Sequence, residues 1–143
     1  MAAEQPDLYA VSPNRSNVLA KETFHLRVVY GSGAVASAQG WGGIGVADTA
    51  TGKMTITLPR TYAKLTGFRW GWAKCAAGAV LTPVILTDSV ATADSNGKGY
   101  VIVETRANAA GTVTDPASGD ELLLEFDVSN DVVNTARQTI TVT

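Results

Sequence analysis

The sequence predicts an all-β fold, either an antiparallel β-sandwich or a small, jelly-roll-like β-barrel, with about seven to eight strands. The first observation is composition: the 143 residues include 17 Thr and 16 Val, which favour strands, and 14 Gly, which favour tight turns. The second is that several segments alternate apolar and polar side chains with the period of two that marks a strand. The third is that clusters of turn-forming residues separate these segments at short intervals.

The length fits one domain with its own hydrophobic core. Residues 1–20 contain Pro6 and Pro13 and show no clear period, so they predict an extended N-terminal arm. Residues 21–143 predict a single β-domain that follows this arm.

The first half of the β-domain contains two regular strands with a small-residue segment between them. From Thr23 onward, every second residue is apolar and shares one face: Phe24, Leu26, Val28 and Tyr30. Residues 31–45 are rich in Gly and Ala and predict a long flexible connection around Trp41. Residues 53–58 predict the next strand, with Met54, Ile56 and Leu58 on one face.

The middle of the chain holds an aromatic strand. Residues 59–67 predict a loop or one short helical turn beginning at Pro59. In the strand that follows, Phe68, Trp70 and Trp72 fall on one face. We interpret this row as part of the core or as an intersubunit contact, and the alternative is a sugar-stacking platform.

The remaining segments complete the strand count. Residues 79–90 carry apolar side chains on both faces of the expected strand, and Pro83 predicts that this strand lies at an edge or contains a bulge. Asn96-Gly97 predicts a hairpin turn. Three further strands are expected over residues 100–106, 121–128 and 137–143.

Composition also excludes several functions. A net charge of −2 gives no broad cationic surface for nucleic acid. There is no basic leader and no run of about 18 apolar residues, so we expect a soluble protein with no membrane contact. With one Cys and one His, neither a disulfide nor a conventional zinc site is expected.

Candidate catalytic and metal-binding residues are few. His25 has no nucleophile motif beside it, and Cys75 is alone, so we expect no enzyme and no cofactor. The acids near the C-terminal end form the closest approach to a cluster: Asp115, Asp120, Glu121, Glu125 and Asp127. Paired acids suit calcium binding or glycoside hydrolysis. Because three of these acids alternate with leucines, we interpret them as a solvated strand face, and the others as turn residues.

Residues 100–130, YVIVETRANAAGTVTDPASGDELLLEFDVSN, contain two strands joined by a G-T-x-T-D-P-x-x-G-D connection. This segment resembles the head decoration, or capsid cement, proteins of tailed bacteriophages. The resemblance implies a virion protein, made in the host cytoplasm, that binds the capsid exterior and stabilises the head by bridging major capsid protein subunits. It also implies a homo-oligomer, with a trimer favoured, and no catalytic residues.

Under this hypothesis the arm and the segment around Trp41 would meet the capsid or another subunit. The expected contact residues are Leu8, Tyr9, Val11 and Trp41. The alternatives are another virion component, such as a tail-tube or head-fibre subunit, and a carbohydrate-binding β-sandwich module. An enzyme would need a concave site that joins His25 to carboxylates.

Overall fold

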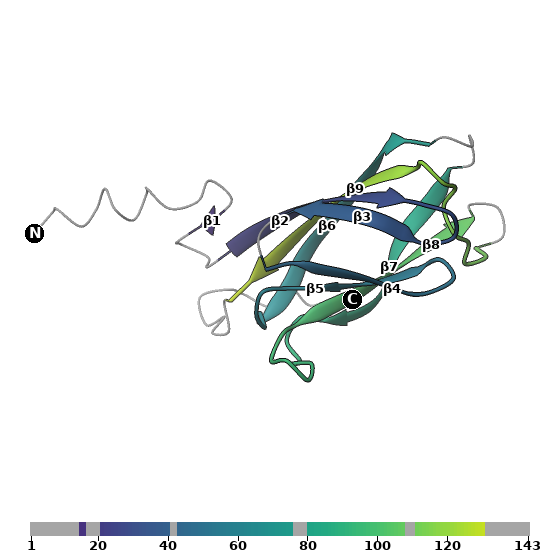
Figure 1. Ribbon diagram of the computed structural model, residues 1–143. Helices are drawn as coiled ribbons and strands as arrows, with labels where there is room; N and C mark the ends of the chain where they lie inside the picture. The colour runs from purple at the N-terminus through teal and green to yellow at the C-terminus, as the bar shows by residue number, and fades with distance from the viewer. Residues whose placement is uncertain (1–14, 17–20, 41–42, 76–79, 108–110, 131–143) are drawn as a thin grey trace, which may run out of the picture.

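The computed structural model describes residues 15–16, 21–40, 43–75, 80–107 and 111–130. Within these ranges the chain forms nine strands, all paired antiparallel, in two sheets that pack as layers (Figure 1). The all-β sandwich that the sequence predicts is therefore confirmed.

The first sheet contains five strands. They are β1 (Arg15–Ser16), β2 (Lys21–Tyr30), β3 (Val35–Gly40), β9 (Glu121–Ser129) and β6 (Lys64–Lys74). β1 and β3 share one edge of β2, β9 pairs along the other edge, and β6 pairs with β9. β9 therefore lies inside the sheet, between two strands that come much earlier in the chain.

The second sheet contains four strands. In order across the sheet they are β4 (Gly45–Ala50), β5 (Lys53–Thr57), β8 (Tyr100–Ala107) and β7 (Leu81–Ser89). β7 is an edge strand, and its register shifts between Ile85 and Thr87. Pro83 lies in this strand, which confirms the predicted edge position, because an edge strand can dispense with one N–H donor.

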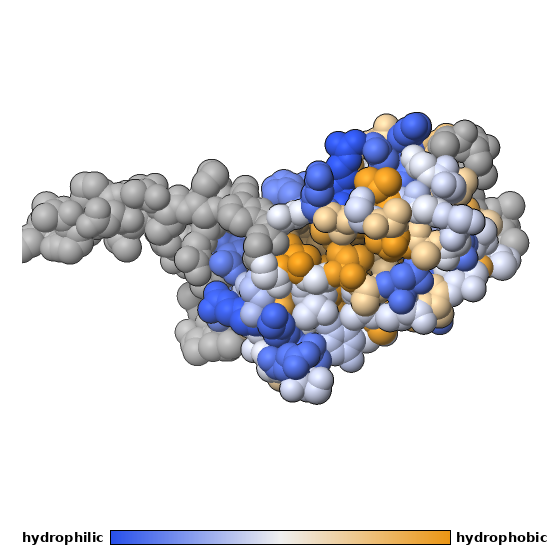
Figure 2. Space-filling view, viewed as in Figure 1, coloured by the Kyte–Doolittle hydropathy of each residue, from blue (hydrophilic) through white to orange (hydrophobic). Residues whose placement is uncertain are grey.

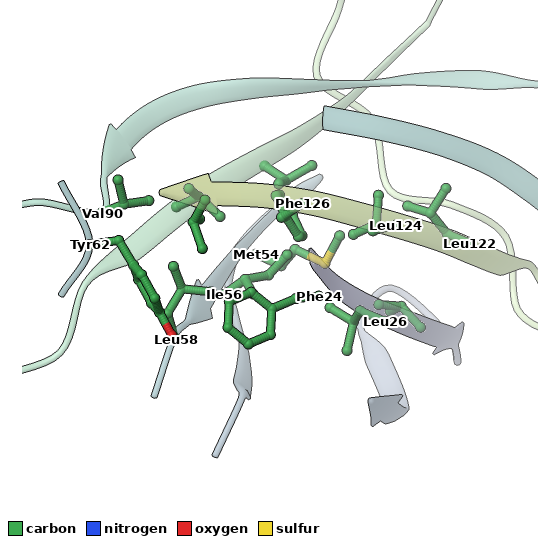
Figure 3. Packing of buried hydrophobic residues seen from close by; sticks show 14 of the residues in the cluster. Phe24, Leu26, Met54, Ile56, Leu58, Tyr62, Val90, Leu122, Leu124 and Phe126 are labelled. Atoms are coloured by element: carbon green, nitrogen blue, oxygen red, sulfur yellow. The ribbon is translucent and has the colours of Figure 1, made fainter. Parts of the chain in front are cut away.

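The core lies between the sheets and comes from the predicted apolar alternations (Figure 3). The inward side chains of β2, β5, β8 and β9 are almost fully buried: Phe24, Leu26, Val28, Tyr30, Met54, Ile56, Val101, Val103, Leu122, Leu124, Phe126 and Val128. Burying a Val, Leu, Ile, Phe or Met side chain contributes roughly 1.5–3 kcal/mol. The period-two pattern thus sets both the strands and the face that each one buries.

Aromatic rings order one part of this core. Across the inner face of the first sheet, Phe24, Phe126 and Phe68 occupy neighbouring positions in register. The rings of Phe68 and Phe126 stack with centroids 5.2 Å apart. Tyr62, in the loop after β5, meets Phe24 edge-on at 5.7 Å. The Tyr62 contact ties this loop to β2, and the Phe68–Phe126 contact joins β6 to β9.

The prediction for residues 31–45 is wrong in part, because a strand lies inside the expected flexible connection. Residues 35–40 form β3, which pairs with β2 from Leu26 to Tyr30. β3 buries little of its own surface, since residues 36–40 are all exposed. Backbone pairing rather than side-chain burial holds this strand, so its sequence carries no apolar alternation.

The structure also tests the predictions for two loops. The segment between β5 and β6 is a loop, without a helical turn. The Asn96-Gly97 turn is confirmed, with Gly97 at a φ of 76°. The strand predicted over residues 137–143 lies outside the described residues, as do Leu8, Tyr9, Val11 and Trp41.

Of the N-terminal arm, the structure describes β1, which pairs with Lys21 and Glu22. None of the described residues belongs to a helix long and apolar enough to cross a membrane.

Candidate binding surface

One leucine stands on the solvent side of the first sheet. Leu122 and Leu124 face the core, so Leu123 between them faces outward, and it is 43% exposed. The other exposed large hydrophobic residues among those described are Trp70, Val80 and Leu86. Leu123 differs from these because it lies on β9, in the middle of the sheet.

Strand register places defined neighbours around Leu123. On the outer face, rows of three residues run across β2, β9 and β6. The rows are Thr23, Asp127 and Gly67, then His25, Glu125 and Arg69, then Arg27, Leu123 and Gly71. Leu123 therefore has an arginine on one side, a glycine on the other and a charged row next to it.

Arg69 is the centre of the charged network. Its guanidinium donates hydrogen bonds of 2.9 Å to both carboxylate oxygens of Asp127 and one of 2.7 Å to Glu125. The Thr23 hydroxyl donates to Asp127 at 2.7 Å. Hydrogen bonds from Arg69 are the main reason that the pKa values of Asp127 and Glu125 are lowered. Both acids are thereby held as carboxylates. They lie on the outward strand face that the sequence predicts, but the expected solvated position is wrong for Asp127, which is 7% exposed because Arg69 and Thr23 cover it.

On the other side of Leu123, Arg27 forms an ion pair with Glu121. In these pairs the cation is the more exposed partner. The Arg27 and Arg69 side chains are 47% and 52% exposed, against 24% for Glu121 and 10% for Asp127. A partner that approaches this face therefore meets guanidinium groups first.

A hollow of about 350 Å³ opens in this face. Its lining comes from neighbouring stretches of β2, β6 and β9: His25, Leu26, Arg27, Arg69, Trp70, Gly71, Leu123, Leu124 and Glu125. Gly71 helps to form the hollow because, apart from Gly71 itself and its two chain neighbours, no described residue has an atom within 4 Å of the point where its Cβ would stand. Leu123 and Gly71 together make an apolar, open centre within a charged rim. We name this site the Leu123 hollow.

Gly67, four residues earlier on the same face, has a different role. A Cβ at Gly67 would lie 2.8 Å from Asp127 Oδ2 and 3.4 Å from Arg69 Nη1. The absence of a side chain at Gly67 is therefore what lets the Arg69 guanidinium reach Asp127. The network beside the hollow depends on this glycine.

The aromatic row of β6 does not form one exposed platform. Phe68 stacks on Phe126, and Trp72 donates its indole N–H to the Leu81 carbonyl at 2.8 Å. These contacts confirm the core interpretation for Phe68 and Trp72. Trp70, by contrast, is 41% exposed.

The predicted turn acids have structural partners. Asp115 accepts a 2.5 Å hydrogen bond from the Gly52 amide, and Asp120, which is buried, accepts one from the Ala117 amide at 3.0 Å. Asp94 accepts hydrogen bonds from the amides of Asn96 and Lys98. Asp120 and Asp94 each shape their own loop, which is the turn role that the sequence indicates for Asp120, whereas Asp115 joins its loop to the β4–β5 turn.

The described residues hold no group of three or more His, Cys, Asp or Glu side chains arranged to bind a metal ion. His25 is exposed beside Glu125, and Cys75 is a half-buried thiol.

A second charged cluster lies on the outer side of the second sheet. Glu104 is 3% exposed and pairs with Arg106 at 2.6 Å and Lys53 at 3.4 Å. Burial opposes ionisation of Glu104, but hydrogen bonds from Arg106 and Lys53 outweigh it and lower the pKa. This cluster is satisfied internally and joins neighbouring strands.

The sequence predicted the acids of this face but not the Leu123 hollow. One signal was present: the outward positions of β9 read Glu121, Leu123, Glu125 and Asp127, so a single leucine stands among acids. The space beside it could not be inferred, because it requires the register that places Gly71 opposite Leu123.

No protein family model, no curated protein and no solved structure matches this chain.

Proposed function

We propose that the protein is a tailed-phage virion component, a decoration protein that binds the outside of the capsid and stabilises the head by bridging major capsid protein subunits. Two lines support the proposal. The first is the resemblance of residues 100–130 to that family. The second, which carries it, is the Leu123 hollow, an apolar centre inside a charged rim on a rigid sheet.

This anatomy suits binding between folded proteins. Interfaces commonly place an apolar anchor at the centre and polar groups around it, and a few central residues supply most of the affinity. The rim is already ordered by the Arg69 and Arg27 ion pairs, so less side-chain entropy is lost on docking. The exposed guanidinium groups favour approach by an acidic surface.

Bridging explains stabilisation without catalysis. A protein that binds only assembled, adjacent capsid subunits shifts the equilibrium toward the assembled shell by mass action. The role requires a stable domain and complementary surfaces. The sandwich supplies the first, and the Leu123 hollow is our candidate for the second.

The test is adsorption of the purified protein to capsids of the encoding phage assembled without it. We expect the unaltered protein to bind and Leu123→Ala to bind at least about tenfold more weakly. Leu86→Ala is the matched control, because Leu86 is a leucine of similar exposure, 45%, on the second sheet. Absence of adsorption by the unaltered protein would overturn the proposed function. Equal effects of the two substitutions would overturn the role of the Leu123 hollow.

Electron microscopy of labelled particles distinguishes this function from the other virion roles. Label on heads supports a decoration protein, whereas label confined to tails or fibres contradicts it.

A further inference from the structure

Apart from the two-residue β1, the strands at the edges of the two sheets are β3 and β6 in the first and β4 and β7 in the second. An unprotected edge is a template for pairing with another chain, so proteins protect edges with charges, Pro or bulges. Three of these strands carry charges or Pro, and the pairing of all four, β3 included, shifts register at least once. β6 has Lys64, Arg69 and Lys74 and two register shifts, and β7 has Pro83 and a register shift. β4 has a register shift next to Asp48.

β3 is the exception. Its sequence, VASAQG, has no charge and no proline, and residues 36–40 are exposed on both faces. Asp48 Oδ2 accepts a hydrogen bond from the Val35 amide, at the start of the strand. This contact covers one end of the edge.

The direction of the backbone groups along β3 follows from its neighbour. The Tyr30 amide donates to Asp120 O, and Tyr30 O accepts from the Gly119 amide, so Tyr30 points toward the β9 side. By alternation, Arg27 and Val29 point toward β3, where they face Gln39 and Ser37. Ala38 and Gly40 therefore direct their N–H and C=O groups away from β2, along the outer edge.

We propose that two copies of this protein associate by antiparallel pairing of β3 with β3, about a two-fold axis at Ala38. This register places Ala36 opposite Gly40 and Ser37 opposite Gln39. Small, uncharged side chains then meet on both faces, without charge repulsion. The same operation on β6, centred at Arg69, would oppose Lys64 to Lys74 and Arg69 to itself. β3 is thus the edge that fits its own copy.

The geometry has a consequence for capsid binding. The two-fold axis of an antiparallel pair about a hydrogen-bonded position is perpendicular to the sheet, so both outer faces point the same way. A dimer would therefore present two Leu123 hollows toward one surface. Capsid binding by the two hollows rests on the proposed function, whereas the dimer itself does not. The two sites would bind an array of capsid subunits with avidity.

The test is the molar mass in solution, by light scattering or sedimentation over a dilution series. We expect twice the chain mass of 14.9 kDa. Ala38→Lys should raise the dissociation constant at least about tenfold, because two like charges would face each other across the axis. Ala73→Lys is the matched control, since Ala73 is an exposed alanine on the protected β6 edge. It should leave the mass unchanged.

Circular dichroism and thermal melting check that each variant folds. Should Ala38→Lys fail to fold, Ala38→Pro tests the same point. It removes an amide that points away from β2, so the dimer should dissociate while the monomer stays folded.

A monomeric unaltered protein, a trimer, or equal dissociation of Ala38→Lys and Ala73→Lys would each overturn the β3 pairing. The trimer implied by the resemblance would need a different, head-to-tail contact. Capsid adsorption by a monomeric protein would contradict the dimer while leaving the proposed function intact.

Discussion

Gly67 and Gly71 lie on the same outer face of β6, four residues apart, yet they have opposite surroundings. A side chain at Gly67 would collide with the Asp127 carboxylate, 2.8 Å from the added Cβ. A side chain at Gly71 would meet nothing within 4 Å. The first glycine preserves an ion-pair network, and the second preserves an empty space. Only the first should matter for stability.

Gly67→Ala should destabilise the protein by about 1–3 kcal/mol, because Asp127 must move away from Arg69 or the strand must shift. Gly71→Ala should leave stability within about 0.5 kcal/mol or raise it slightly. Urea unfolding of both variants measures the difference. Equal destabilisation by the two substitutions would contradict the role assigned to Gly67.

At the scale of elements, the β4–β5 turn is locked to the loop after β8. The Gly52 amide donates to Asp115, and its carbonyl accepts from the Thr105 amide at 2.8 Å. The Thr105 hydroxyl donates to Thr114 O at 2.6 Å. Gly52 has a φ of +64°, and its Cβ would lie 2.8 Å from Thr114 O. Conformation and space both require glycine here.

Gly52→Ala should therefore cost about 1–2 kcal/mol for the left-handed backbone and about 1–3 kcal/mol more for the collision. Gly97→Ala is the control, because Gly97 has a φ of +76° but nothing within 4 Å. Gly97→Ala should therefore lose only the about 1–2 kcal/mol of stability that comes from the left-handed backbone. Chemical unfolding measures both variants, and Gly52→Ala should have the lower unfolding midpoint. A Gly97→Ala variant as unstable as Gly52→Ala would contradict the role of the collision at Gly52.

The strands divide into those that the sequence predicts and those that it does not, among them β3 and β4. β2, β5 and β9 bury one face, so their side chains alternate and reveal both position and orientation. β3 gains its stability from hydrogen bonds to β2, and a small-residue sequence such as VASAQG suits a loop equally well. Likewise, Leu123 reads as an ordinary strand leucine until register places Gly71 beside it. The local sequence pattern cannot predict features that depend on pairing between segments far apart in the chain.

At the scale of the whole molecule, ion pairs on both sheets link stability to pH. The pKa values of Glu104, Glu125 and Asp127 are all lowered in the folded protein. Their contribution is fully present above the unfolded-state pKa values of about 4 and is lost as pH falls through the lower folded values. Below pH 4 the unfolded chain binds more protons than the folded one, so acid favours unfolding.

Arg69→Gln should make stability at neutral pH lower and its decline below about pH 4 less steep, because Asp127 and Glu125 lose the main cause of their lowered pKa values. Lys98→Gln removes the same charge in the turn between β7 and β8, away from this network. Its stability curve should run parallel to that of the unaltered protein. Thermal melting from pH 2 to pH 7 measures all three curves, and an unchanged slope in Arg69→Gln would refute the linkage.

The position of β9 inside the first sheet also determines when the sheet can form. β2 and β6 have no direct pairing with each other, and both wait for residues 121–129. During synthesis, the apolar faces of two long strands are therefore complete well before the strand that joins them exists. Contacts between residues about a hundred positions apart form slowly, so folding should be late and concerted rather than progressive along the nascent chain.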